Sequence, residues 1–302
     1  MFHHFHNDKH LPAQGSLSAN EFIKMIDWLN KHYSILNATQ YTKKFEDGNI
    51  KNTDICLSFD DGLKCQFDIA VPVMEKLGIE AFFFVYSSAF SKNPDPLEIY
   101  RYFRTSCYSD IDDFYHHFFC SVKQINPEKF SREHSKYSQM SYLAEFPFYT
   151  ENDKWFRYLR DHYLVGNQYT EIMNDLMIKK DFDLISAKKI LWMSEQDLID
   201  TESKGHIIGL HSYSHPTKMS KLSKTDQKLE YQKNNAHLSK LIGKPIKTMS
   251  HPCGDYNDIT LKILKGIGIN IGFRSNMSVK KINSRLEIPR EDHANVFKEM
   301  HA

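Results

Sequence analysis

The sequence predicts an α/β fold, and three observations support this prediction. Short apolar runs typical of buried strands occur at 54–59, 81–86 and 206–210. Segments with helical spacing of apolar residues separate these runs, and such alternation favours a mainly parallel sheet covered by helices. A chain of 302 residues is also long enough to bury the core of one barrel or of two domains.

The first predicted helix covers residues 19–32. Ser18 and Glu21 form a capping-box pattern, and apolar residues recur at helical spacing behind them. The other elements expected before residue 91 are a candidate first strand within 1–10, a polar connection at 37–53, a strand at 54–59, a helix over 67–77 that is broken at Pro72 and ended by Gly78, and a strand at 81–86.

Residues 91–190 differ in character from the rest of the chain. They begin with several turn-forming residues and continue with segments rich in Tyr, Phe and charge. Because this stretch is too long for a loop between two strands, we interpret it as a helical insertion with helices over 97–119, 127–145 and 153–180. The insertion could be a lid over a site or a set of extra helices outside the main domain.

Strands and helices alternate again after the insertion, so residues 1–90 and 191–302 are expected to form one domain. The remaining expected elements are helices over 193–203, from the Ser223 cap to Gly243 and from the Asn257 cap to 265, and strands at 206–210, 246–249, 269–273 and 286–288.

Charge and composition exclude several classes of protein. Lysine and arginine number 39 and aspartate and glutamate 38, so the net charge of +1 gives no electrostatic reason to expect binding to nucleic acid or to a membrane surface. We expect no membrane span, because no run of about 18 apolar residues occurs. The first residues do not resemble a signal peptide, so the expected location is cytoplasmic. Five cysteines without a Cys-x-x-Cys pair argue against a disulfide framework and a thiolate zinc site.

Two adjacent carboxylates follow the predicted strand at 54–59. Asp60, Asp61 and Gly62 could form only a turn, which is common for an Asp-Gly pair. Two like charges at one strand tip are costly to bury, however, and a metal ion or a shared proton is the usual reason for such a pair. The two carboxylates are therefore candidate site residues.

Two histidines follow the strand predicted at 206–210. His211 and His215 have a spacing of four, but Pro216 disfavours helical geometry at His215, so both should lie on a loop that leaves the strand. Two imidazoles and one carboxylate form a three-ligand zinc set that leaves a position open for water. Both motifs follow strand ends, where barrel enzymes assemble their active sites.

The sequence SFDDG at 58–62 and the later HSYSH at 211–215 resemble the first two motifs of the NodB-homology polysaccharide deacetylases. These are metal-dependent enzymes that remove N- or O-acetyl groups from sugars. The resemblance covers about 1–90 and 191–302 and implies an irregular (β/α)7 barrel interrupted by the insertion. It also implies that Asp61, His211 and His215 bind a divalent metal, with zinc as the expected ion, and that Asp60 is the general base.

The third family motif, ordinarily Arg-x-x-Pro-Tyr, is degenerate here. The chain has MSHPCGDYN at 249–257, in which Cys253 follows the proline. The family uses the backbone N–H at that position as an oxyanion donor, and Cys253 can supply it equally well. The arginine that orients the base is missing, and Arg290 is the best substitute because it also follows a predicted strand. A surface ion pair is the alternative role for Arg290.

The general acid is expected among the histidines, because an amide nitrogen leaves badly unless it is protonated. The opening FHHF resembles the start of a subgroup whose acid comes from the first strand, and His3 is our choice. His4 would face the opposite side of a strand, and His6 would compete only if the strand ended early. His293 is the second choice.

These observations lead to one functional hypothesis and two alternatives. The hypothesis is a cytoplasmic, metal-dependent hydrolase that removes an acetyl or formyl group from an amino sugar. The sugar would be nucleotide-linked, lipid-linked or part of an oligosaccharide in surface-polysaccharide or O-antigen synthesis. One alternative is an allantoinase-like hydrolase of a non-sugar amide. The other is a carbohydrate-binding barrel without activity, suggested by the degenerate third motif. The sequence does not indicate an oligomeric state.

Overall fold

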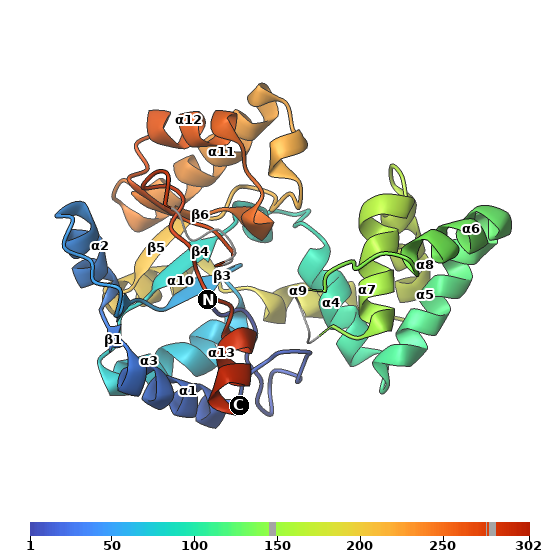
Figure 1. Ribbon diagram of the computed structural model, residues 1–302, viewed down its shortest axis with the longest axis horizontal. Helices are drawn as coiled ribbons and strands as arrows, with labels where there is room; N and C mark the ends of the chain where they lie inside the picture. Colours follow the sequence, from blue (N-terminus) through green and yellow to red (C-terminus); the bar gives the residue numbers. More distant parts are fainter. Residues whose placement is uncertain (145–148, 276, 278–281) are drawn as a thin grey trace. The chain divides into compact units, whose positions relative to one another are not determined.

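The computed structural model describes residues 1–144, 149–275, 277 and 282–302. The chain divides into two compact units (Figure 1), the first comprising Met1–Asp95 and Lys189–Ala302 and the second Pro96–Lys188. The first unit holds a parallel sheet with helices packed on it, and the α/β prediction is therefore confirmed.

The main sheet has five parallel strands in the order β3-β4-β5-β6-β7. A separate parallel pair is formed by β1 and β2. The strands are β1 (Ser34–Ile35), β2 (Asp54–Ile55), β3 (Ser58–Asp60), β4 (Phe82–Val85), β5 (Ile207–Leu210), β6 (Thr248–Ser250) and β7 (Ile271–Phe273). The strand predicted at 54–59 is thus interrupted, because its two halves pair in different sheets.

Each edge of the main sheet carries one further bridging residue. Phe2 pairs with Phe59 of β3, and Ile288 pairs with Phe273 of β7, both in parallel. The two edges meet where the His293 N–H donates to the Met1 carbonyl at 3.1 Å. The sheet is therefore curled into the predicted irregular barrel. The segments predicted as first and last strands each form a single bridge with the sheet.

The α-helices that the described residues form wholly within the first unit are α1 (Ala19–His32), α2 (Ala38–Glu46), α3 (Val71–Leu77), α10 (Glu195–Ser203), α11 (Lys224–Ile242), α12 (Asp258–Gly266) and α13 (His293–Met300). The capping box of α1 is confirmed, since the Ser18 hydroxyl accepts the Glu21 N–H and the Glu21 carboxylate accepts the Ser18 N–H. The expected polar connection at 37–53 is wrong, because it contains α2. The sequence analysis also missed α13, which begins after an Asp292 cap.

The second unit is formed by helices around an aromatic core. Its helices are α4 (Leu97–Ser106), α5 (Ile111–Ile125), α6 (Pro127–Tyr137), α7 (Glu151–Tyr158) and α8 (Gln168–Lys179), and α9 (Leu184–Leu191) continues into the first unit. The helix predicted at 97–119 is two helices, because Asp110 caps the start of α5. The helix predicted at 127–145 corresponds to α6, which ends at Tyr137. Residue 145 lies outside the described residues. The segment 153–180 contains α7, a π-helical turn and α8.

Alternate residues of the strands face opposite sides of the curled sheet. Phe59 stacks on Phe83 with ring centroids 4.6 Å apart and contacts Phe22 of α1, so this face packs against helices. Phe84 lies on the other face, and a side chain at Gly209 would meet its ring at 2.6 Å. Since Asp60 pairs with Phe84 in register, Asp60 also points to the inner face of the curled sheet.

The core gives a pH-dependent stability prediction at His206, which precedes β5. Its ring is buried, and its Nδ1 accepts the Ala81 N–H at 3.0 Å. Burial lowers the pKa of His206 to about 4, whereas unfolded histidine titrates near 6.5. The unfolded chain therefore binds more protons between these values, and the stabilisation present above pH 6.5 is lost as the pH falls toward 4.

We expect this loss to be on the order of 3 kcal/mol of unfolding free energy. Urea denaturation between pH 4.5 and 7 would measure it. In His206→Asn the amide oxygen can still accept the Ala81 N–H. The unfolding free energy of this variant should decrease less steeply as the pH falls. An equally steep decrease in the variant would contradict the assignment to His206.

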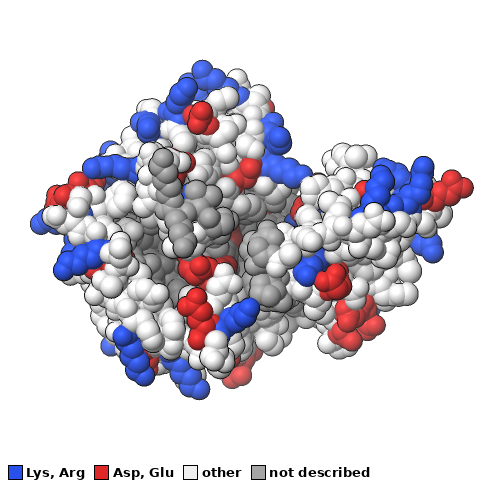
Figure 2. All heavy atoms as spheres, in the orientation of Figure 1, with Lys and Arg blue, Asp and Glu red and all other residues white. Residues whose placement is uncertain are grey.

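Charged side chains of both signs occur on each unit on the face shown in Figure 2. This mixture agrees with the net charge of +1. Among the helices of the described residues, each is too short or too polar to cross a bilayer.

Candidate active site

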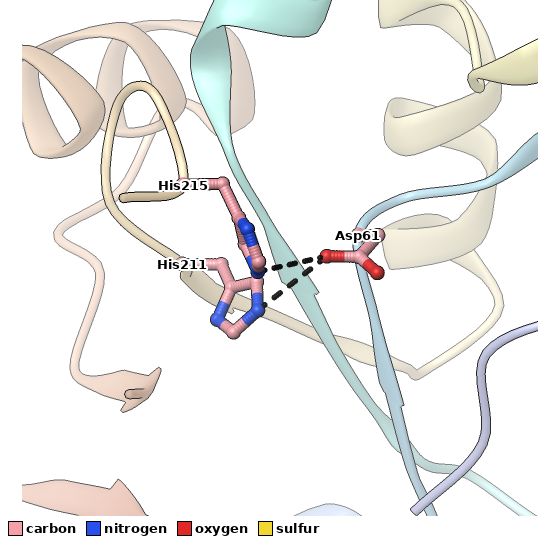
Figure 3. Close-up of side chains that lie close together, drawn as sticks. All are labelled: Asp61, His211 and His215. Atoms are coloured by element: carbon pink, nitrogen blue, oxygen red, sulfur yellow. Dashed lines mark ion pairs between the residues drawn. The ribbon is translucent and has the colours of Figure 1, made fainter. Parts of the chain in front are cut away.

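Three side chains from two distant strand ends converge in the first unit. Asp61 follows β3, whereas His211 and His215 follow β5. The Asp61 Oδ1 lies 3.5 Å from the His211 Nε2 and 3.4 Å from the His215 Nε2. Figure 3 shows the three side chains pointing toward one another. All three are buried, and their candidate ligand atoms lie within 4.8 Å of one another.

This donor set fits a divalent metal ion. The His211 Nδ1 lies 2.9 Å from the Ser250 carbonyl, which can only accept, so the hydrogen of the neutral ring is on Nδ1. The Nε2 lone pair is then directed toward Asp61. Burial lowers the pKa of His211 to about 3, which keeps the ring neutral, as a metal ligand must be. Two imidazole nitrogens and one carboxylate oxygen form a common catalytic zinc set.

The backbone around these ligands is strained. Asp61 has φ 75°, Ser212 φ 65° and His215 φ 54°, all in the left-handed region that L-residues avoid. Each such residue costs on the order of 1–3 kcal/mol. The Ser212 hydroxyl accepts the His215 N–H at 3.0 Å and thereby fixes the loop between the histidines. Strain of this kind is typical of a functional site.

Asp60 is buried beside the three ligands and is paired with Arg290. The two guanidinium Nη atoms donate to the two carboxylate oxygens at 2.7 and 2.6 Å, which is a bidentate pair. Asp60 Oδ2 lies 3.8 Å from the His211 Nε2. The Arg290 side chain also donates to Ser58, Ser250 and the Arg274 carbonyl, so its position is fixed on several sides.

The electrostatics of this pair keep Asp60 ionised. Burial alone would raise the pKa of Asp60, but the Arg290 charge and hydrogen bonds, together with the nearby histidines, hold it well below its usual range. Asp60 is thus a fixed carboxylate beside the three candidate ligands. Arg290 lies inside the site, and the alternative of a surface ion pair is wrong because the residue is buried.

His3 lies at the edge of this cluster. Its Nε2 is 4.0 Å from the Asp60 Oδ2, and its side chain is 26% exposed. It can therefore face both the carboxylate and a molecule from solvent. His6 is directed elsewhere, since its Nδ1 lies 2.9 Å from the Ser16 hydroxyl.

His293, the second choice for the acid, is held in the wall of the first unit. Its Nε2–H donates to the Gly15 carbonyl at 2.7 Å, and its ring stacks on Phe2. Its Nδ1 lies 3.4 Å from the Asp292 Oδ1, and the acid role of His293 stays a prediction. The contacts with Gly15 and Phe2 could not be read from a sequence pattern, because both residues are distant in the chain.

Cys253 lies in a turn after β6. Its side chain is exposed, and its φ of 52° places it in the left-handed region. Ser250, the last residue of β6 and three residues before Cys253, is the one that contacts Asp60 and Arg290. The oxyanion role of the Cys253 backbone N–H remains a prediction.

A comparison with protein families supports the resemblance drawn from the motifs. Residues 166–272 match the family model described as polysaccharide deacetylase. This range contains both histidines and the degenerate third motif, and the structure adds Asp60 and Asp61 from outside it. The resemblance to the polysaccharide deacetylases is confirmed. The comparison with curated proteins gave no match.

Solved structures of deacetylases have a similar fold. A de-N-acetylase from Aggregatibacter actinomycetemcomitans is 15% identical with a TM-score of 0.56, and 96% of this chain and 92% of that chain are covered. IcaB from Ammonifex degensii is 14% identical with a TM-score of 0.55, covering 96% and 88%. The deacetylase PplD from Streptococcus pyogenes, in complex with acetate, is 13% identical with a TM-score of 0.53, covering 96% and 89%. At these identities the likeness establishes the polysaccharide deacetylase fold alone.

The sequence analysis missed two residues that contact members of this candidate site. Ser250 contacts Asp60 and Arg290 through its hydroxyl and His211 through its carbonyl. Its place just after the strand predicted at 246–249 was an available signal. Gln66 donates to the Asp60 carbonyl at 2.6 Å, but its position before α3 gave no indication of this contact.

Proposed function

We propose that this protein is a metal-dependent deacylase that removes an acetyl or formyl group from an amino sugar. One observation carries the proposal: Asp61, His211 and His215 form a buried ligand set beside Asp60, which Arg290 keeps ionised. The family match supports a sugar substrate and a deacetylation reaction.

The residues have separate roles in this reaction. Asp61, His211 and His215 would hold the divalent ion, expected to be zinc, which polarises the acyl carbonyl and lowers the pKa of water. Asp60 accepts a proton from the attacking water, and Arg290 keeps the carboxylate oriented for this transfer. The Cys253 N–H donates to the oxygen that becomes negative.

His3 completes the reaction as the general acid. Its Nε2, 4.0 Å from the Asp60 Oδ2, delivers a proton to the leaving nitrogen. The oxygen of the attacking water forms a bond to the acyl carbon, and the bond between this carbon and the sugar nitrogen then breaks. The products are a free amine on the sugar and a carboxylate. We also propose that the chain belongs to the subgroup whose general acid is a histidine near the N-terminus.

The biological setting is also part of the proposal. We propose a nucleotide-linked, lipid-linked or oligosaccharide substrate in cytoplasmic synthesis of surface polysaccharide or O-antigen, and the family match supports only the acetylated polysaccharide part of this proposal. The cytoplasmic location rests on the sequence expectation alone. For the second unit, a lid over the site and a set of extra helices outside the barrel both remain predictions.

The test is release of acetate from N-acetylated amino-sugar oligosaccharides and nucleotide sugars. We expect activity to be lost after chelation and restored by Zn²⁺, because the ligand set lies directly beside the proposed base. Allantoin in the same panel tests the non-sugar amide, and its preferential hydrolysis would favour that alternative. Glycan binding with one metal per chain and no turnover would favour the inactive barrel.

A further inference from the structure

One face of α11 contacts the loop that carries the two histidine ligands. Glu230, Asn234 and His237 are spaced by four and three residues, so they lie along one side of this helix. Helix α11 packs against β5 and against the turn at Ser87–Phe90 that follows β4. The polar side of α11 therefore faces two strand ends of the candidate site.

Glu230 accepts three hydrogen bonds from the loop between His211 and His215. Its Oε2 accepts the Tyr213 N–H at 2.9 Å and the Ser214 N–H at 2.8 Å, and its Oε1 accepts the Ser214 hydroxyl at 2.7 Å. The residues on either side of this pair, Ser212 and His215, have the left-handed backbone described above. One carboxylate thus holds a strained loop in the conformation that directs His215 toward Asp61.

Asn234 joins the ends of β4 and β5. It is fully buried, and its Oδ1 accepts the backbone N–H of His211 at 3.0 Å. Its Nδ2 donates to the Val85 carbonyl at 2.9 Å and to the Ser87 hydroxyl at 2.7 Å. Both ends of the carboxamide are used, so the amide orientation is determined by its surroundings.

A chain of hydrogen bonds fixes that orientation. Glu195 can only accept, so His237 donates to it from Nε2 at 2.9 Å. The other ring nitrogen, Nδ1, lies 2.9 Å from the Ser87 hydroxyl. Ser87 accepts from the Asn234 Nδ2, so the contacts of His237 hold the hydroxyl that Asn234 binds. Buried polar networks whose members are all hydrogen-bonded are rigid.

We propose that Glu230 and Asn234 are positioning residues that set the geometry of the two histidine ligands. The inference rests on the metal site of the proposed function and deepens it. Neither residue touches the three candidate ligand atoms. Asn234 holds the backbone of His211, and Glu230 holds the loop that ends at His215. Replacing partners that orient ligands typically costs about 10- to 100-fold in metal affinity or activity.

The experiment is titration of metal-free protein with Zn²⁺ by calorimetry, and with Co²⁺ by visible absorption. We expect Glu230→Leu and Asn234→Leu each to weaken Zn²⁺ affinity about 10- to 100-fold. Glu230→Gln should retain most of the affinity, because its carboxamide oxygen can accept both N–H groups. Asn235→Leu is the matched control, since Asn235 is the next residue on α11 and bonds instead to Ser239.

Hydrogen exchange of the metal-free variants gives a readout that does not depend on metal. Faster exchange confined to residues 207–216 in Glu230→Leu and Asn234→Leu is expected from lost positioning. If Asn234→Leu fails to fold, the two Glu230 variants still decide the question. Wild-type affinity in Glu230→Leu would overturn the positioning role and leave the proposed function intact. If wild type bound no Zn²⁺, or if His211→Ala bound Zn²⁺ as tightly as wild type, both the positioning role and the metal site of the proposed function would be overturned.

Discussion

Asp60→Asn is expected to reduce deacylation by about 10²- to 10⁴-fold, the range for loss of a general base. The amide is nearly the same size as the carboxylate and can still accept one bond from Arg290. It cannot take a proton from water at the pH of the assay. Rates of acetate release with saturating substrate and Zn²⁺ would measure the effect. Metal affinity should change much less than the rate, because Asp60 is not one of the three proposed ligands.

A matched control for this substitution is Asp54→Asn. Asp54 is also buried and pairs with a cation, its Oδ2 lying 3.1 Å from the Lys44 Nζ, but it belongs to β2 outside the site. Its substitution should leave the rate of deacylation within a few-fold of wild type. An undiminished rate in Asp60→Asn would refute the assignment of Asp60 as the base while leaving the metal site untouched.

Arg290→Met is expected to lower the unfolding free energy by about 3–5 kcal/mol at pH 7, the cost of removing one partner of a buried ion pair. The remaining Asp60 carboxylate would be buried without its countercharge. Activity should fall as well, because the base would lose both its orientation and its charge. Urea denaturation would give the stability difference. The double variant Asp60→Asn with Arg290→Met should recover much of the loss, since no charge is then left uncompensated.

The effect of Arg290→Met should depend on pH. In wild type the folded pKa of Asp60 is depressed, so the pair stabilises the fold above the unfolded carboxyl pKa of roughly 4. That contribution is lost as the pH falls through the folded pKa. Without Arg290, burial raises the pKa of Asp60, and ionisation then destabilises the fold. The stability difference between the proteins should therefore grow from pH 4 to 7, and a constant difference would contradict the pairing.

Local sequence patterns determined much of the fold of the first unit. The capping box at Ser18, the Gly78 stop and the Asn257 cap each mark a helix end that the structure contains. These signals depend on hydrogen bonds within a few residues, so they act wherever the segment lies. The apolar run at 81–86 likewise became β4, buried on both faces. The same local rules failed at 37–53. Helix α2 lies in this segment, but only two of its side chains are buried, so its sequence is mostly polar and shows no clear apolar spacing.

Motif chemistry also identified the residue types of the candidate site, because two adjacent carboxylates are costly to bury without a metal ion or a shared proton. Which of them meet was decided by the tertiary structure. The curl of the sheet brings Asp61 to His211 and His215, and its closure brings Arg290 from near the end of the chain to Asp60. The same closure brings the His293 ring to the Gly15 carbonyl.

The supporting residues could be found only in three dimensions. Ser250, Glu230 and Asn234 act through backbone groups of distant segments, and their identities alone carry no sign of these contacts. A hydrogen bond to a backbone group can be made by many side chains, so sequence leaves such a role unspecified. The sequence by itself thus determined the chemistry available to this protein and the ends of its elements. The tertiary structure decided which groups share one site, because only chain closure sets distances between segments far apart in sequence.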